Sequence, residues 1–216
     1  LGAAYAALSR SGSLVYQSGG MRQRIVLVDR QGVERTVIPQ RHSFINPRFS
    51  PEGNRIAVSL KNGGRRDVWV YDLRSRTLSR VTTEGDANDR PEWMPDGSRV
   101  VFRSNRAGEM AFWSQAADGS GRAELLVQDP AGRMWEGVVT ADGRSLVYRT
   151  GSVGTADIWM RRLDGDTTRH PLATTRFTEW SGRPSPDGRW LAYESDETGE
   201  YEVYVGPLSD SGTRQK

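Results

Sequence analysis

The chain has 216 residues, of which 36% are hydrophobic and 26% are charged, and its formal net charge is +3. This composition is ordinary for a globular protein and excludes a disordered chain, and no apolar run reaches the ~20 residues of a membrane-spanning helix. Without any cysteine, the chain has no disulfides, thiolate metal sites or cysteine nucleophiles.

Five segments of similar sequence follow one another along the chain, and each contains a turn glycine. These glycines are Gly12, Gly53, Gly97, Gly143 and Gly188. They are separated by 41, 44, 46 and 45 residues, and a period of ~40–50 residues with short apolar runs is typical of β-propellers. Each repeat therefore predicts one blade of four strands.

The first strand of each repeat is short and ends at a turn of the Ser-Pro-Asp-Gly type; the earliest is expected at residues 3–8. Second strands are expected at 14–17, 55–60, 99–104, 145–150 and 190–195. Third strands are expected at 25–29, 68–72, 111–115, 158–162 and 202–205. Weaker fourth strands are expected at 36–38, 78–82, 124–127 and 170–173.

The second and third strands are apolar at successive positions, as in residues 100–102 and 146–148. Side chains alternate between the two faces of a strand, so both faces of these strands must be buried. Small antiparallel sheets packed face to face around an axis satisfy this requirement, and we predict an all-β propeller of four-stranded blades. A two-sheet sandwich is the alternative, and helices should be nearly absent.

The expected blades cover residues 1–40, 44–83, 88–128, 134–174 and 179–216, and the last blade lacks most of its fourth strand. We therefore expect a fragment of a propeller with six or more blades, in the form of an open arc or a ring with a gap. The terminal blades of such a fragment would expose apolar faces, which predicts poor solubility and further blades outside the chain.

The repeated Ser-Pro-Asp-Gly turns, each followed by an apolar strand, resemble the TolB-type propeller repeat, a relative of WD-repeat blades. The phrases at 27–32, 67–73, 177–179, 185–193 and 202–205, in that order, resemble the C-terminal propeller of bacterial membrane-anchored serine/threonine protein kinases. Ala141 and Pro184 depart from the repeat pattern. The resemblance implies an extracytoplasmic or periplasmic sensing module of a receptor-like kinase whose catalytic domain lies outside the chain.

No catalytic motif is present: the chain has neither a Gly-x-Ser-x-Gly elbow nor the kinase motifs, and His42 and His170 are its only histidines. Asp86, Asp89 and Glu92 form its densest group of acids, but their spacing does not fit a calcium loop. We expect a non-enzymatic binding module without cofactor or metal. The alternatives are a free-standing TolB-like protein that docks envelope partners, and the accessory propeller of a peptidase or glycosidase.

Loops that enter the first strands, with loops between second and third strands, should form one rim around the propeller mouth, where side chains of several blades converge. The predicted rim residues are His42, Phe44, Asp86, Asp89, Arg90, Arg133, Trp135, Glu136, Glu179 and Trp180. Trp135 and Trp180 could equally wedge between blades as core residues. We expect a protein or small-molecule ligand at this mouth, no nucleic acid, because the arginines are scattered, and no membrane contact by this segment.

Overall fold

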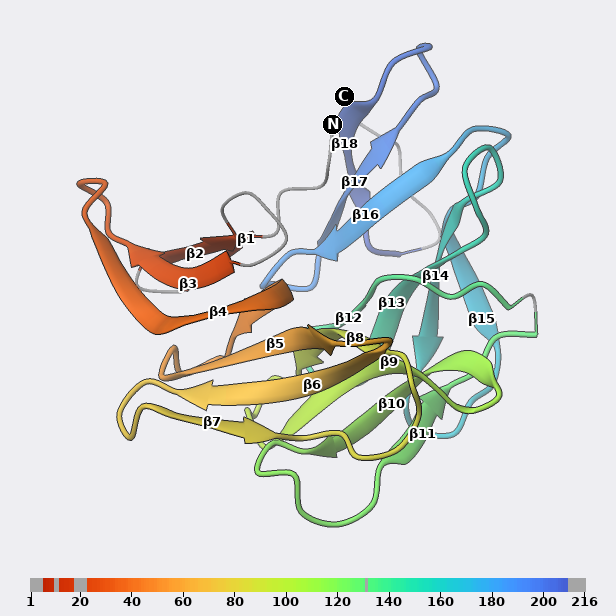
Figure 1. The fold of residues 1–216 in the computed structure, drawn as a ribbon. Coiled ribbons are helices and arrows are strands. Elements are labelled where there is room, and N and C mark those ends of the chain that lie inside the picture. Colours follow the sequence, from red (N-terminus) through yellow and green to blue (C-terminus); the bar gives the residue numbers. More distant parts are fainter. Residues whose placement is uncertain (1–5, 10–11, 18–22, 131, 210–216) are drawn as a thin grey trace. The chain divides into compact units, whose positions relative to one another are not determined.

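The structure is a computed structural model that describes residues 6–9, 12–17, 23–130 and 132–209 (Figure 1). These residues form strands and turns without a helix, as predicted. They divide into two compact units, which we describe separately. The first unit comprises Leu1–Glu109 with Trp113–Glu124, and the second comprises Met110–Phe112 with Leu125–Lys216.

The strands form successive antiparallel sheets in which each strand pairs with the next in sequence. The first sheet contains β1 (Ala6–Leu8), β2 (Leu14–Gln17), β3 (Gln23–Val28), β4 (Glu34–Phe49), β5 (Arg55–Asn62), β6 (Arg65–Asp72) and β7 (Thr77–Arg80). The second contains β8 (Asn88–Trp93), β9 (Arg99–Ala107), β10 (Glu109–Ala116) and β11 (Glu124–Val127).

Two further sheets belong to the second unit. One contains β12 (Gly137–Val139), β13 (Ser145–Thr150), β14 (Asp157–Arg162) and β15 (Arg169–Ala173). The other contains β16 (Glu179–Pro184), β17 (Trp190–Ser195) and β18 (Glu202–Pro207). The predicted second strands at 14–17, 145–150 and 190–195 coincide with β2, β13 and β17. The sheets thus confirm the all-β propeller architecture.

Strand β4 departs from the prediction, which placed the fourth strand of one repeat and the first strand of the next in separate segments. In the structure one continuous strand of 16 residues is both the fourth strand of the first repeat and the first strand of the second. Its first part pairs with β3 and its second part, from Ser43, pairs with β5. Pro39 lies at a register shift opposite β3, and Pro47 lies at the register shift opposite β5, so neither needs an N–H for the ladder. The prolines therefore keep the chain extended instead of ending the strand.

The second strands β5, β9 and β13 are buried on both faces, as predicted, whereas in β17 buried residues alternate with partly or fully exposed ones. All six residues of β13 are buried, and β5 has five consecutive buried residues. In the first unit, Ala57, Val68 and Val70 form a core with Val100 and Phe102 of β9. One face of the β5–β6 sheet thus packs on the sheet that follows it in sequence.

In the second unit, Val147 and Ile158 pack in the same way on Leu191, Tyr193 and Tyr204 of the β16–β18 sheet. The opposite face of this last sheet differs, because Trp190, Val203 and Val205 are 43%, 63% and 39% exposed. Val203 and Val205 correspond in register to the buried Val68 and Val70 of β6, and Trp190 corresponds to the half-buried Arg55 of β5. The last sheet therefore has an uncovered apolar face among the described residues.

Several expectations concern parts that the structure leaves open. The exact blade boundaries and the closure of the ring stay predictions. The start of the first expected strand, residues 3–5, and the expected beginning of a last fourth strand, residues 212–216, lie outside the described residues.

Candidate functional site

Two arginine–carboxylate pairs occupy equivalent places in neighbouring repeats. Arg103 of β9 and Arg149 of β13 are both buried on second strands, and each pairs with an acid at the start of its repeat. The partners are Asp89 and Glu136, two of the predicted rim residues. The pairs therefore mark the region in which the sequence predicts a binding site, and they belong to different units.

The pair in the first unit is formed by Arg103 and Asp89. Arg103 donates from Nε to Oδ1 of Asp89 at 2.8 Å and from Nη2 to Oδ2 at 2.9 Å. The side chains are only 6% and 2% exposed. Arg66 of β6 adds a second cation, with Nη1 at 3.0 Å from Oδ2 of Asp89. Two-pronged contacts of this kind fix the geometry of the carboxylate as well as neutralising it.

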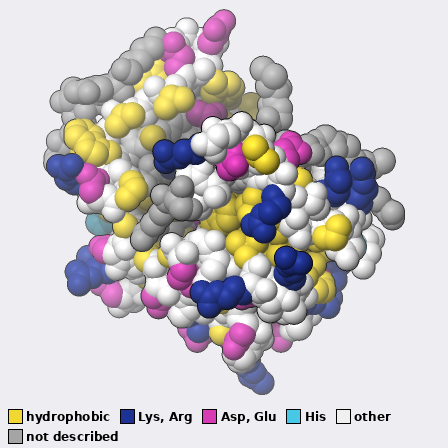
Figure 2. All heavy atoms as spheres, turned by 90° about the vertical axis from the view of Figure 1, so that its left-hand side faces the viewer, with side chains coloured by type: hydrophobic (Ala, Val, Ile, Leu, Met, Phe, Trp, Pro, Cys, Tyr) yellow, Lys and Arg dark blue, Asp and Glu magenta, His cyan; other side chains and the backbone are white. Residues whose placement is uncertain are grey.

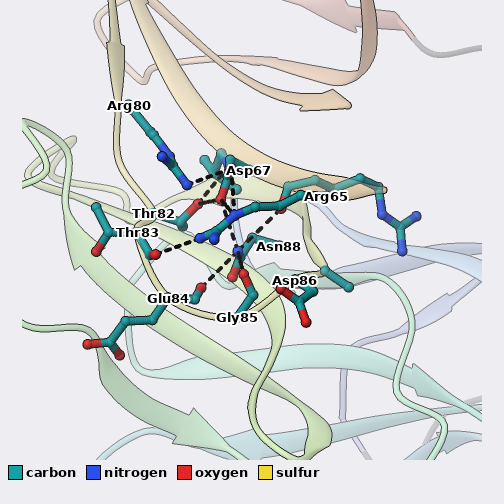
Figure 3. Close-up of polar contacts among 12 residues, drawn as sticks. Arg65, Asp67, Arg80, Thr82, Thr83, Glu84, Gly85, Asp86 and Asn88 are labelled. Atoms are coloured by element: carbon teal, nitrogen blue, oxygen red, sulfur yellow. Dashed lines mark hydrogen bonds and ion pairs between the residues drawn. The ribbon is translucent and has the colours of Figure 1, made fainter. Parts of the chain in front are cut away.

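Asp67 of β6 is the centre of a second polar network in the same unit (Figure 3). Its carboxylate accepts hydrogen bonds from Arg65 at 3.0 Å, Arg80 at 2.8 Å, Thr82 at 3.0 Å and Asn88 at 3.2 Å. These donors come from β6, β7 and the segment that leads into β8. A buried carboxylate with so many donors is satisfied, and its role is to hold the segment before β8 in place.

The backbone around Asp86 is held from β9, since Oδ1 of Asn105 accepts from the N–H groups of Asp86 and Ala87, both at 3.0 Å. The Asp86 side chain itself is exposed. Arg90, four residues on, has a φ of 54° at the register shift between Asp89 and Glu92. This bulge re-aims the start of the first strand.

The pair in the second unit is flanked by aromatic rings. Arg149 donates from Nε to Oε1 of Glu136 at 2.5 Å, and its side chain is 2% exposed. Its guanidinium lies 4.1 Å from the ring centre of Trp180 and 5.3 Å from that of Trp135. The backbone N–H of Ser181 also donates to Oε1 of Glu136, at 3.3 Å. A planar guanidinium suits such stacking, which an ammonium group would not reproduce.

A loop that enters a first strand and loops between second and third strands, the two kinds predicted to form the rim, contribute to this cluster. Trp180, at the entrance to the first strand β16, stands edge-on to Tyr201 at 6.5 Å, and Tyr201 is 53% exposed in the loop between β17 and β18. Trp135 donates from Nε1 to the carbonyl of Gly151 at 2.7 Å, in the loop between β13 and β14. Within this unit the structure brings Trp135, Glu136 and Trp180 together.

A third carboxylate of the second unit, Asp129, is also paired. It accepts from the hydroxyl of Tyr148 at 2.8 Å and from Nη1 of Arg169 at 3.0 Å. Burial, reinforced by this hydrogen bond to an acid, raises the pKa of the Tyr148 phenol above its ordinary value. Tyr148 is therefore a structural donor at neutral pH.

The remaining predicted residues are placed separately. Phe44 is 1% exposed and belongs to the core of the first unit, because its ring packs beneath the sheet. His42 is exposed, and the centre of its ring lies 5.4 Å from that of Phe44 in a T-shaped arrangement. Arg133 donates to Oγ of Ser152 at 3.1 Å. Glu179 is fully buried and accepts the hydroxyl of Thr175.

The sequence reasoning missed Arg66, Arg103, Arg149 and Tyr201. A signal for two of them exists, since Arg103 and Arg149 each follow three apolar residues at the same place in consecutive repeats. A charged residue that continues a buried run predicts a buried partner of opposite charge.

The two acids Asp89 and Glu136 are each bound by an arginine side chain. Within the described residues, no group of three His, Asp or Glu side chains is arranged to hold a metal ion. Lys and Arg side chains are interspersed with Asp and Glu over the face shown in Figure 2.

Comparison with known proteins identifies the fold family. The model of the TolB beta propeller domain matches residues 13–205. The chain belongs to this family. The resemblance to TolB-type repeats is thereby confirmed, and nothing in the comparisons shows the narrower resemblance to kinase propellers.

Two relatives and one enzyme illustrate the match. The Tol-Pal system protein TolB of Anaeromyxobacter dehalogenans (strain 2CP-C) is 30% identical over 100 residues, which are 46% of this chain and 23% of that protein. The crystal structure of TolB from Acinetobacter baumannii has a TM-score of 0.81 at 21% identity, over 97% of this chain and 52% of that one. Oligogalacturonate lyase, solved in complex with manganese, has a TM-score of 0.71 at 15% identity, over 95% of this chain and 65% of that one.

Coverage and sequence identity decide what these matches show about function. The match covers about a quarter of the curated relative's length and about half of the solved TolB chain, so the activity of a whole relative does not transfer directly. The same fold also occurs in an enzyme, at an identity that shows the fold alone. In the part of the chain that the structure describes, no helix is long and apolar enough to cross a membrane.

Proposed function

We propose that this chain is a non-catalytic propeller module that binds a protein partner in the cell envelope, as a TolB-like component. Family membership supports the envelope setting, and the TolB relatives belong by name to the Tol-Pal system. An extracytoplasmic location is part of this proposal. An attached kinase domain stays a prediction, because neither the family match nor the relatives support it.

The observation that carries the proposal is the arginine–aromatic cluster of the second unit. Arg149 and Glu136 hold Trp180 in place, and Trp180 in turn meets the exposed ring of Tyr201. Tyrosine, tryptophan and arginine are the residues most enriched at the energetic centres of protein interfaces. A rigid base with one exposed aromatic at its edge gives a partner a preformed contact that costs little conformational entropy.

The test is binding of the purified 216-residue chain to the purified Pal component of its own organism's Tol-Pal system, measured by biolayer interferometry. Tyr201→Ala should weaken binding about tenfold or more, the effect of removing an aromatic hot spot. Trp190→Ala is the matched control, because Trp190 is a similarly exposed aromatic at the other end of the same sheet, where β17 begins and β18 ends. It should change binding by less than about twofold.

Two results would speak against the proposal. Absence of saturable binding by the unmodified chain would remove the Tol-Pal partner. Equal weakening by Tyr201→Ala and Trp190→Ala would show that the cluster around Trp180 is not the contact. Thermal unfolding of both variants, followed by circular dichroism, separates lost contact from lost fold.

A further inference from the structure

Two adjoining hollows lie on the first unit and share no residue with the proposed partner contact. The first has a volume of about 660 Å³ and is lined mainly by the first half of β4 together with the ends of β6 and β7. The second has a volume of about 710 Å³ and is lined by the middle of β4, the β5–β6 turn and Trp69. His42 and Leu78 line both, so the two hollows lie next to each other.

The floor of these hollows is apolar. Ile38 and Tyr71 are 2% and 6% exposed in the first, and Leu60 is 8% exposed in the second. The hydroxyl of Tyr71 donates to the carbonyl of Val37 at 3.0 Å, so the phenol adds no free donor to the floor. Trp69 of the second hollow has a buried Nε1 without an acceptor among the described residues. Apolar side chains of a ligand would fit such a floor.

The walls are cationic. Arg35 and Arg76 line the first hollow and Arg41 and Lys61 the second, whereas no Asp or Glu lines either one. All four cations are exposed, and among the described residues none makes an ion pair. This contrasts with Arg66, Arg103 and Arg149, each of which has a carboxylate partner.

The neighbouring acid Asp72 is not among the lining residues of either hollow. Its Oδ1 accepts from the N–H groups of Arg74 and Ser75, both at 2.8 Å, which lowers the pKa of its carboxyl and engages it in the turn to β7. Glu34 precedes Arg35 in β4 but is not among the lining residues. Four unpaired cations around an apolar floor are complementary to a ligand with negative charges and apolar side chains.

We propose that these hollows bind an acidic peptide segment of a protein partner, with its apolar side chains on the floor and its carboxylates on Arg35, Arg41, Lys61 and Arg76. A peptide fits better than a small anion because the cations are spread over two hollows that share His42 and Leu78. The site is separate from Tyr201 and stands whether or not the Tol-Pal contact is found.

The test measures fluorescence anisotropy of a fluorescein-labelled octapeptide of alternating Glu and Leu titrated with the full chain. Saturable binding is expected, and Arg41→Gln/Arg76→Gln, which removes one cation from each hollow, should weaken it about fivefold to tenfold, the effect of losing two exposed ion pairs. The matched control Arg122→Gln/Arg144→Gln removes the same charge from two exposed arginines outside the hollows and should change it by less than about twofold.

Three results would overturn the proposal. One is no saturable binding of the Glu–Leu peptide, including the case in which a DNA oligonucleotide binds instead. The second is equal weakening by the two double variants, which would indicate unspecific attraction to a basic protein. The third is equal affinity for octaglutamate, which would show that the apolar floor plays no part.

Discussion

The two arginine–carboxylate pairs are both buried, but the side chains around them differ. Asp89 is bound both by Arg103 and by a second cation, Arg66. Arg149 and Glu136 are instead covered by the rings of Trp180 and Trp135. The repeat thus fixes the position of a buried arginine, while the neighbouring side chains decide whether the site becomes an internal brace or an aromatic surface.

The largest effect should come from breaking the polar pair. Asp89→Ala leaves Arg103 buried without its carboxylate, and removal of one partner of a buried pair costs about 3–5 kcal/mol of the free energy of unfolding. Urea unfolding followed by circular dichroism measures this. The control Asp164→Ala removes a pair whose side chains are 47% and 50% exposed, and it should lower the urea midpoint only slightly because solvent screens such a pair. Equal losses for the two variants would mean that burial of the Asp89 pair contributes nothing.

A smaller effect should come from removing the aromatic cover of Arg149. Trp180→Leu keeps an apolar side chain but removes the ring 4.1 Å from the guanidinium, which should cost about 1–2 kcal/mol of unfolding free energy. Trp190→Leu is the matched control, because no cation stacks on Trp190 among the described residues. If both variants lose the same amount, the stacking on Arg149 is energetically neutral and the contrast between the two pairs disappears.

The smallest effect concerns an exposed carboxylate, which sharpens the contrast with the buried pairs. Asp187 accepts the hydroxyl of Ser185 at 2.5 Å and Nε of Arg189 at 2.6 Å, and these contacts lower its pKa to about 2. A lowered pKa gives stability that is present above the ordinary value and is lost as the pH falls through the folded value.

Asp187→Asn should therefore lower the urea midpoint at pH 6 and converge with the unmodified chain as the pH approaches about 2. The measurement is a series of urea midpoints between these pH values. A difference that stays constant over the whole range would show that the charge of Asp187 is not the cause.

The sequence predicted the parts of the fold that depend on local chemistry. Turn glycines such as Gly53 and Gly97 have φ values of 73° and 70°, which only glycine adopts without strain, and the apolar runs beside them are buried strands. The continuation of the strand between residues 38 and 44 was not predictable in this way. Polar residues and Pro39 indicated a loop there, whereas pairing with β3 and β5 keeps β4 extended.

The candidate site was only partly predictable. Trp135, Glu136 and Trp180 were predicted to share a rim, and within the second unit they do lie together. Phe44 has the same position before a first strand but is a core residue, since tertiary packing and not its loop decides its exposure. The role of Arg149 could not be predicted from the sequence, because it depends on the contacts of Arg149 with the indole rings of Trp135 and Trp180 in the folded chain.

The long strand β4 has a consequence for how the chain can be divided. Its residues up to His42 pair with β3 and those from Ser43 pair with β5, so the two ladders follow each other without a turn between them. A protease or an engineer who cuts the chain at the repeat boundary, near residue 40, therefore cuts an extended strand and not a free loop. Sequence repeats and separable modules are therefore different units here, and a truncation that respects the molecule should fall in the turns on either side of β4.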